Sequence, residues 1–231
     1  MVGKDMTAQS SDQNDRDRAP QASSDLGATI LRAAWLAILL GLLMEGLLLV
    51  LGGALGKVLG LGPIVADLVR NISWSVFVCV GLALGTAVAR ARVPLMGFLG
   101  LFSAPLAFEA SRVLHKGTLE ALAVSGGAGE GLAPLLVALI KGLEYGCLGI
   151  GIGWVSQRRW GGAAAHVAVG LLVGLVFGGL ELSFAMGATP PPPAADLFAG
   201  GLNDVLFPVG CALVLFSAGV LGKRAAGRDA S

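Results

Sequence analysis

Carboxylic acids inside long apolar stretches are the most chemically suggestive feature of this sequence. They are Glu45, Glu109, Glu144, Glu181 and Asp204. An ionised carboxylate in hydrocarbon is costly, so such a residue is expected to face a bundle interior, a partner protein or water. In that setting it can hold a cation, a proton or the amino group of a solute.

Three acid–base pairs are spaced three residues apart, which places both side chains on one face of a helix. These pairs are Asp67 with Arg70, Glu109 with Arg112, and Lys141 with Glu144. Mutual neutralisation and snorkelling toward the interface give the first two pairs a purely structural explanation.

Glu45, Glu181 and Asp204 have no basic residue within helical reach. They are the leading candidates for an ion-binding or solute-binding site, with Glu45 the deepest of the three. We expect help from the amides of Asn71 and Asn203. Lys141 or Arg112 would hold a solute carboxylate or balance charge, and Glu144 and Glu109 complete the candidate set. The structural alternative is an ion pair from Glu45 to Lys141, Arg70 or Arg112.

The apolar stretches predict six membrane spans, because each can cross about 30 Å of hydrocarbon at about 1.5 Å per residue. The predicted spans are Ile30–Leu51, Ile72–Ala89, Pro94–Leu114, Leu132–Val155, Ala163–Gly187 and Leu197–Leu221. The expected fold is therefore all-α, a six-helix bundle in one membrane domain over residues 28–223. Residues 1–27 are polar and predict a disordered cytoplasmic tail, and residues 224–231 predict a short cytoplasmic tail.

Orientation is predicted from Lys and Arg near the spans. One side carries eleven of them, whereas the other carries four, namely Lys57, Arg70, Arg112 and Lys116. This bias predicts both termini in the cytoplasm, which agrees with an even number of spans. The lack of a cleavable signal peptide and the short loops suit a bacterial inner membrane. Counted from the cytoplasmic Arg and Lys residues, the polar side chains lie about 20 to 30 Å from the inner interface. They should therefore form one layer in the outer third of the bilayer.

A degenerate threefold repeat of two-helix units is one interpretation of the spans. Cys79, Cys147 and Cys211 each precede a cytoplasmic basic residue by eleven or twelve positions. Chance similarity among helices rich in Leu, Gly, Ala and Val is the competing interpretation. Ordinary apolar packing also explains these cysteines better than a soft-metal site, so no metal ligands are predicted.

Glycine stripes predict close helix packing beside the acidic layer. Gly170, Gly174 and Gly178 are spaced four apart, and Glu181 continues their face. Small residues at this spacing let two membrane helices approach closely. Glu181 is therefore expected to point at a neighbouring helix rather than at lipid.

The composition excludes several classes of function. Net charge is +1, so nucleic acid is not an expected partner, and the sequence contains no zinc-protease, nucleophile-elbow or phosphate-loop motif. No cofactor is indicated, and an enzyme is not expected.

We expect a membrane transporter or solute-binding component that handles a cation, a proton or a small zwitterion through an outward-facing acidic cavity. The alternative is a non-catalytic membrane subunit that scaffolds a larger complex, with a second copy or other membrane subunits as partners.

Overall fold

A computed structural model describes residues 5–57, 60–87, 92–124 and 134–229, and every regular element in these ranges is helical. The elements are α1 (Asp5–Ala54), α2 (Leu61–Leu84), the short 3₁₀ helix η1 (Gly85–Ala87), α3 (Arg92–Ala121), α4 (Pro134–Val155), α5 (Ala163–Met186) and α6 (Ala194–Asp229). Each of the six α-helices contains a stretch long and apolar enough to cross a bilayer. The all-α fold class and the six predicted spans are thereby confirmed.

The second span differs most from its predicted bounds. It covers Leu61–Leu84 rather than Ile72–Ala89, and residues 88–91 lie outside the described residues. A hydropathy reading starts the span late because Asp67, Arg70 and Asn71 depress the average. Asp67 and Arg70 form a salt bridge of 3.1 Å within the helix. This pairing neutralises the two charges and lets the helix continue through them.

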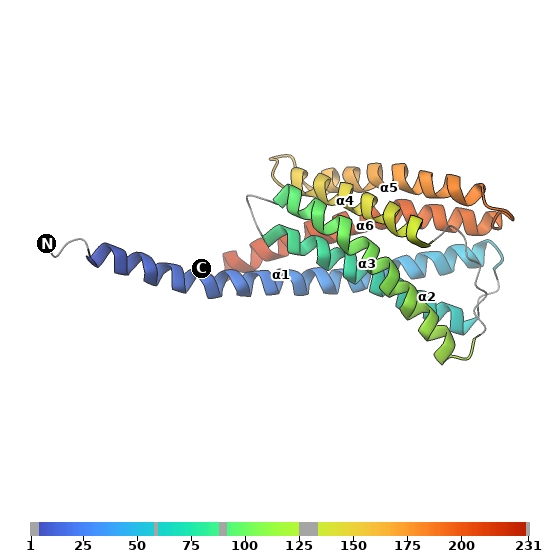
Figure 1. Cartoon of the computed structure of the whole chain (residues 1–231), viewed down its shortest axis with the longest axis horizontal. Helices are drawn as coiled ribbons and strands as arrows, with labels where there is room; N and C mark the ends of the chain where they lie inside the picture. The colour runs from blue at the N-terminus through green and yellow to red at the C-terminus, as the bar shows by residue number, and fades with distance from the viewer. Residues whose placement is uncertain (1–4, 58–59, 88–91, 125–133, 230–231) are drawn as a thin grey trace.

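α1 begins at Asp5, far before its apolar stretch at Leu26–Ala54. The structure thus gives a helix where composition predicts a disordered tail. Extending an existing helix costs much less than nucleating one, so a membrane span can propagate into an adjoining polar segment. In Figure 1 this part of α1 projects away from the bundle.

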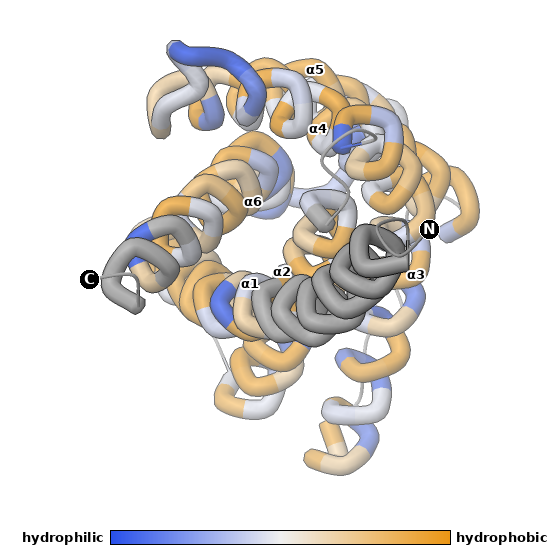
Figure 2. The backbone as a smooth tube through the Cα atoms, turned by 90° about the vertical axis from the view of Figure 1, so that its left-hand side faces the viewer, coloured by the Kyte–Doolittle hydropathy of each residue, from blue (hydrophilic) through white to orange (hydrophobic). Residues whose placement is uncertain are grey.

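Consecutive helices run in alternating directions along the bundle, and α3 crosses it obliquely (Figure 1). The start of α1 and the end of α6 therefore lie toward the same end. In Figure 2 hydrophobic residues predominate along the coloured parts of the helices, as expected for helices that cross a bilayer. Large apolar side chains such as Leu43, Leu106 and Leu172 are mostly exposed on the outer surface of the bundle.

Glycines bring two pairs of helices into backbone contact. A Cβ added to Gly149 of α4 would lie 2.2 Å from the Met96 carbonyl oxygen of α3. On α5, a Cβ added to Gly174 would lie 2.5 Å from the Val205 carbonyl oxygen of α6. The predicted stripe on α5 therefore packs on α6, because any larger side chain would force the backbones apart.

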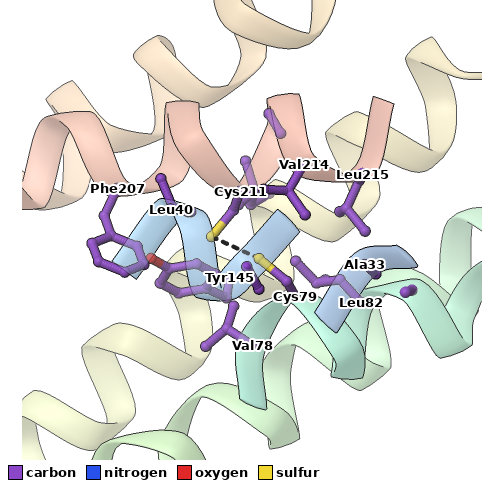
Figure 3. Packing of buried hydrophobic residues seen from close by; sticks show 14 of the residues in the cluster. Ala33, Leu40, Val78, Cys79, Leu82, Tyr145, Phe207, Cys211, Val214 and Leu215 are labelled. Atoms are coloured by element: carbon purple, nitrogen blue, oxygen red, sulfur yellow. Dashed lines mark hydrogen bonds between the residues drawn. The ribbon is translucent and has the colours of Figure 1, made fainter. Parts of the chain in front are cut away.

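The half of the bundle nearest the two termini has an apolar core, and this half is here called the apolar half. Its buried side chains include Leu82 of α2, Met96 of α3 and Leu148 of α4. Figure 3 shows Cys79 and Cys211 pointing at each other in this core, with their sulfur atoms 3.5 Å apart.

The environment of the cysteines does not support the threefold repeat. Cys79 and Cys211 are fully buried, whereas Cys147 is exposed on α4. A true repeat would give all three the same surroundings. The repeat would pair each even-numbered span with the odd-numbered span that follows it, and the sixth with the first. α4 nevertheless packs much less extensively on α5 than on α3. Similar composition is therefore the better explanation of the resemblance between the spans.

Candidate solute-binding cavity

A cavity of about 360 Å³ lies among α2 to α6, at the end of the bundle opposite the termini. We call this region the cavity end. Its lining combines polar, charged and aromatic side chains from five helices. They are Arg70, Asn71, Trp74, Phe108, Ser111, Arg112, His115, Val137, Lys141, Tyr145, Glu181, Asn203, Asp204 and Phe207. Alternating helix directions explain the gathering, because late residues of odd helices meet early residues of even ones.

Lys141 is the centre of the cavity's charge network. Its ammonium donates to Glu144 on its own helix at 2.9 Å and to Asp204 of α6 at 3.1 Å, and it lies 3.1 Å from Glu181 of α5. Lys141 is 9% exposed and Glu144 is fully buried. A buried charge is tolerated only when partners of opposite charge surround it, which is the arrangement found here.

The charges in this cluster do not balance. One ammonium faces three carboxylates, so full ionisation would leave a net charge of −2 (+1 and −3). Protons on the acids, a bound cation or the arginines elsewhere in the lining can supply the difference, because uncompensated charge is very costly away from water. The cluster is therefore chemically suited to holding a proton or a cation.

Glu45 of α1 takes no part in that cluster. It is buried and accepts a hydrogen bond of 2.7 Å from the Nδ2 of Asn71 on α2. No ion pair from Glu45 to Lys141, Arg70 or Arg112 is found among the described residues. Asn71 lines the cavity, whereas Glu45 lies behind it. Glu45 therefore orients Asn71 and connects α1 to the cavity wall.

An aromatic group separates the cavity from the apolar half. Trp74 packs edge-on against Tyr145, with ring centroids 5.5 Å apart, and against Phe207 at 6.4 Å. Figure 3 shows Tyr145 and Phe207 next to the cysteine pair at the start of the apolar core. These rings give the polar cavity an apolar floor and a surface on which a hydrophobic part of a solute could rest.

Basic side chains on α2 and α3 also line the cavity. Arg70 pairs with Asp67, which also lies 3.3 Å from the Nε2 of His115. Arg112 lies 3.5 Å from Glu109, which is about half exposed. The cavity thus has an acidic side on α4, α5 and α6 and a basic side on α2 and α3.

The structure brings most of the predicted site residues together. Six of the nine line the cavity, namely Asn71, Arg112, Lys141, Glu181, Asn203 and Asp204. Glu45 and Glu144 lie immediately behind the wall through their contacts with Asn71 and Lys141. Glu109 is not in the lining and reaches the cavity only through Arg112. Glu45 and Glu144 are buried, Glu181 and Asp204 are partly buried in the cavity wall, and Glu109 is exposed, contrary to the expectation of a single enclosed layer of acids.

Several lining residues were not predicted from the sequence. Trp74, Tyr145 and Phe207 resemble ordinary apolar residues in their spans, and His115 lies near acids in no recognisable motif. Trp74 and Asn71 are three apart on α2, so they share a helical face. The three-residue spacing from Asn71, a predicted site residue, is the one sequence signal that points to Trp74.

Comparisons with known proteins give no further identification of the site. No protein-family model significantly matches the chain, and neither does any curated protein or solved structure.

Proposed function

We propose that this protein is a membrane transport or solute-binding component that takes a small cationic or zwitterionic solute into the cavity end. The main support for this proposal is a cavity of about 360 Å³ whose acidic wall has more negative than positive charge. Small-molecule sites are typically about 300–1,000 Å³, with an apolar lining and a few convergent polar groups. This cavity has that size and that composition.

The one-sided distribution of polar groups supports binding over an open channel. A conducting pore needs a polar or water-filled route through the bilayer. Below the cavity, most of the buried interior consists of apolar residues such as Leu82, Leu148 and Leu215, and Ser75 and His166 are the buried polar residues described outside the cavity end. A solute that enters the cavity end would cross only if the helices rearrange, as in alternating access, or if a partner subunit completes the path.

The basic residues near the termini support the orientation. In our proposal both termini are cytoplasmic, so the cavity opens on the outer side of a cytoplasmic membrane. The motivating asymmetry is eleven Lys and Arg residues against four near the spans. A single reactive cysteine or a protease cleavage site could be added at either terminus. In intact cells, a site on the cytoplasmic side should be protected from a reagent or protease that does not cross the membrane.

A scaffolding subunit is the second candidate function, and one observation favours it. A single lysine contacts acids from α4, α5 and α6, which is also how an internal structural crosslink would be built. In that case the cluster would fix helix positions and bind nothing. Consistent copurification with the same membrane partner, together with an absence of solute binding, would support this function.

Thermal stability in nanodiscs tests solute binding directly. The purified chain would be heated with alkali cations, simple amines and amino acids, each in large excess. A ligand at 100 times its Kd stabilises the folded state by about 2.7 kcal/mol, which corresponds to several degrees at ~2–4 °C per kcal/mol. At least one solute should raise the Tm of the wild type in this way.

Two glutamate variants make the result specific. Glu181→Gln changes a carboxylate of the cavity wall, so it should weaken or abolish the ligand-induced shift. Glu120→Gln changes an exposed glutamate that does not line the cavity, so it should leave the shift intact. No shift with any solute, or equal shifts in both variants, would reject the proposed function.

A further inference from the structure

Lys141 has no free donor with which to bind a solute. An ammonium has three N–H donors, and three carboxylates already surround this one within 3.1 Å. Its side chain is also almost wholly buried. Lys141 is therefore part of the acidic wall's internal structure, and a solute carboxylate must find its partner elsewhere.

The acidic wall has acceptor atoms without donors. Glu181 Oε1 and Asn203 Oδ1 are buried and accept no hydrogen bond from the described residues, and both side chains line the cavity. Buried polar atoms are nearly always satisfied, so two orphan acceptors on one wall suggest a missing donor. A protonated amine offers up to three donors and a positive charge, which suits the excess of carboxylates.

The basic wall has the complementary vacancy. Arg112 Nε is buried and forms an ion pair with Glu109 at 3.5 Å, but it donates no hydrogen bond to any of the described residues. Arg112 and Arg70 both line the cavity on this side. Arginine is well suited to a carboxylate because its planar guanidinium can donate two parallel hydrogen bonds.

Aromatic side chains lie in the lining together with these two walls. Trp74, Phe108 and Phe207 contribute apolar surface to the same cavity. The volume of about 360 Å³ corresponds to roughly a dozen water molecules at ~30 Å³ each. An occupant would thus be small, with a charged group at each end and an apolar body between them.

We propose that the solute is a small zwitterion whose amine binds Glu181 and Asn203 and whose carboxylate binds Arg112, with its apolar body against Trp74. This inference rests on the proposed function and narrows it to one class of ligand. It also assigns Lys141 a structural role and makes Arg112 the determinant that separates zwitterions from simple amines.

Three matched probes test the assignment by calorimetry or thermal shift on the full chain in nanodiscs. They are 4-(aminomethyl)benzoate, which carries both charges, 4-methylbenzylamine, which lacks the carboxylate, and 4-methylbenzoate, which lacks the amine. Charged hydrogen bonds in a buried site typically change affinity about ten- to a hundredfold. The zwitterion should therefore bind at least about tenfold more tightly than either analogue.

Variants assign the two ends of the probe. Arg112→Gln should reduce zwitterion affinity to the level of the amine and leave the amine affinity nearly unchanged. Glu181→Gln should weaken both amine-containing probes. The exposed Arg159→Gln and Glu120→Gln serve as matched controls, and the Tm without ligand reports whether each variant folds normally.

Several results would overturn the zwitterion assignment. They include equal binding of amine and zwitterion, an Arg112→Gln variant that binds all three probes as the wild type does, and no binding of any probe. In each case the panel of cations, amines and amino acids decides separately whether the proposed function survives. A shift with a simple cation alone would retain solute binding and reject the zwitterion.

Discussion

The two ends of this bundle are built from the same helices and solve opposite problems. In the apolar half, α3 and α4 touch through backbone at Gly149 and Met96, and the interior is filled by side chains such as Leu82. At the cavity end, the same helices supply charged side chains around a cavity of about 360 Å³. Close packing in the apolar half therefore holds the helices together, while the cavity end retains buried charge and open space.

Removing the positive charge at the centre of the cavity end should lower the free energy of unfolding more than any other change considered. Lys141→Met leaves Glu144, Glu181 and Asp204 without their common cation. Breaking a buried ion pair from one side typically costs about 3–5 kcal/mol, so the free energy of unfolding should fall by about that amount. Chemical unfolding in detergent micelles, followed by circular dichroism, measures it.

Two further variants test whether charge is the cause. Adding Glu144→Gln to Lys141→Met should recover part of the loss, because one fewer acid is left unpaired. Lys116→Met removes an exposed lysine of α3 and should change stability by no more than about 0.5 kcal/mol. A Lys141→Met protein as stable as the wild type would show that the cavity end tolerates unbalanced charge.

A methyl group added in the apolar half should have an intermediate effect. Gly149→Ala places Cβ 2.2 Å from the Met96 carbonyl oxygen, so α3 and α4 must move apart. Overpacking of this kind typically costs about 1–3 kcal/mol, which the same unfolding experiment would detect.

Gly179→Ala is the matched control for that change. Nothing lies within 4 Å of a Cβ at Gly179 of α5, so this variant should be as stable as the wild type or slightly more stable. Equal behaviour of the two alanine variants would mean that the apolar half does not depend on backbone contact.

A single hydroxyl between α1 and α2 should have the smallest effect. The Oγ of Ser75 donates to the Ala37 carbonyl oxygen of α1 at 2.7 Å, with the Ile72 carbonyl oxygen also within reach at 2.9 Å. Hydrogen bonds between membrane helices average about 0.6 kcal/mol, so Ser75→Ala should cost about that much in unfolding free energy.

Ser103→Ala provides the comparison for Ser75→Ala. The Oγ of Ser103 is buried and has no hydrogen-bond partner among the described residues. Its loss should therefore be neutral or slightly stabilising. A larger cost for Ser103→Ala than for Ser75→Ala would contradict these hydrogen-bond assignments.

Features that depend on neighbours along one helix could be predicted from the amino-acid sequence. The six spans follow from apolar length, and the i,i+3 pairs Lys141–Glu144, Asp67–Arg70 and Glu109–Arg112 all form. The α5 glycines that are spaced four residues apart also pack against a neighbouring helix, as predicted. These features are readable because helical geometry fixes which residues share a face.

The contacts between acids on different helices, by contrast, became clear only from the packed bundle. Lys141 forms ion pairs with Glu181 and Asp204, whereas Glu45 contacts Asn71. Glu109 does not line the cavity. Cys147 is exposed, whereas Cys79 and Cys211 are buried. Contacts between helices depend on the rotation, tilt and vertical offset of each helix. Those variables are set by packing over the whole bundle, so spacing along one span does not contain them.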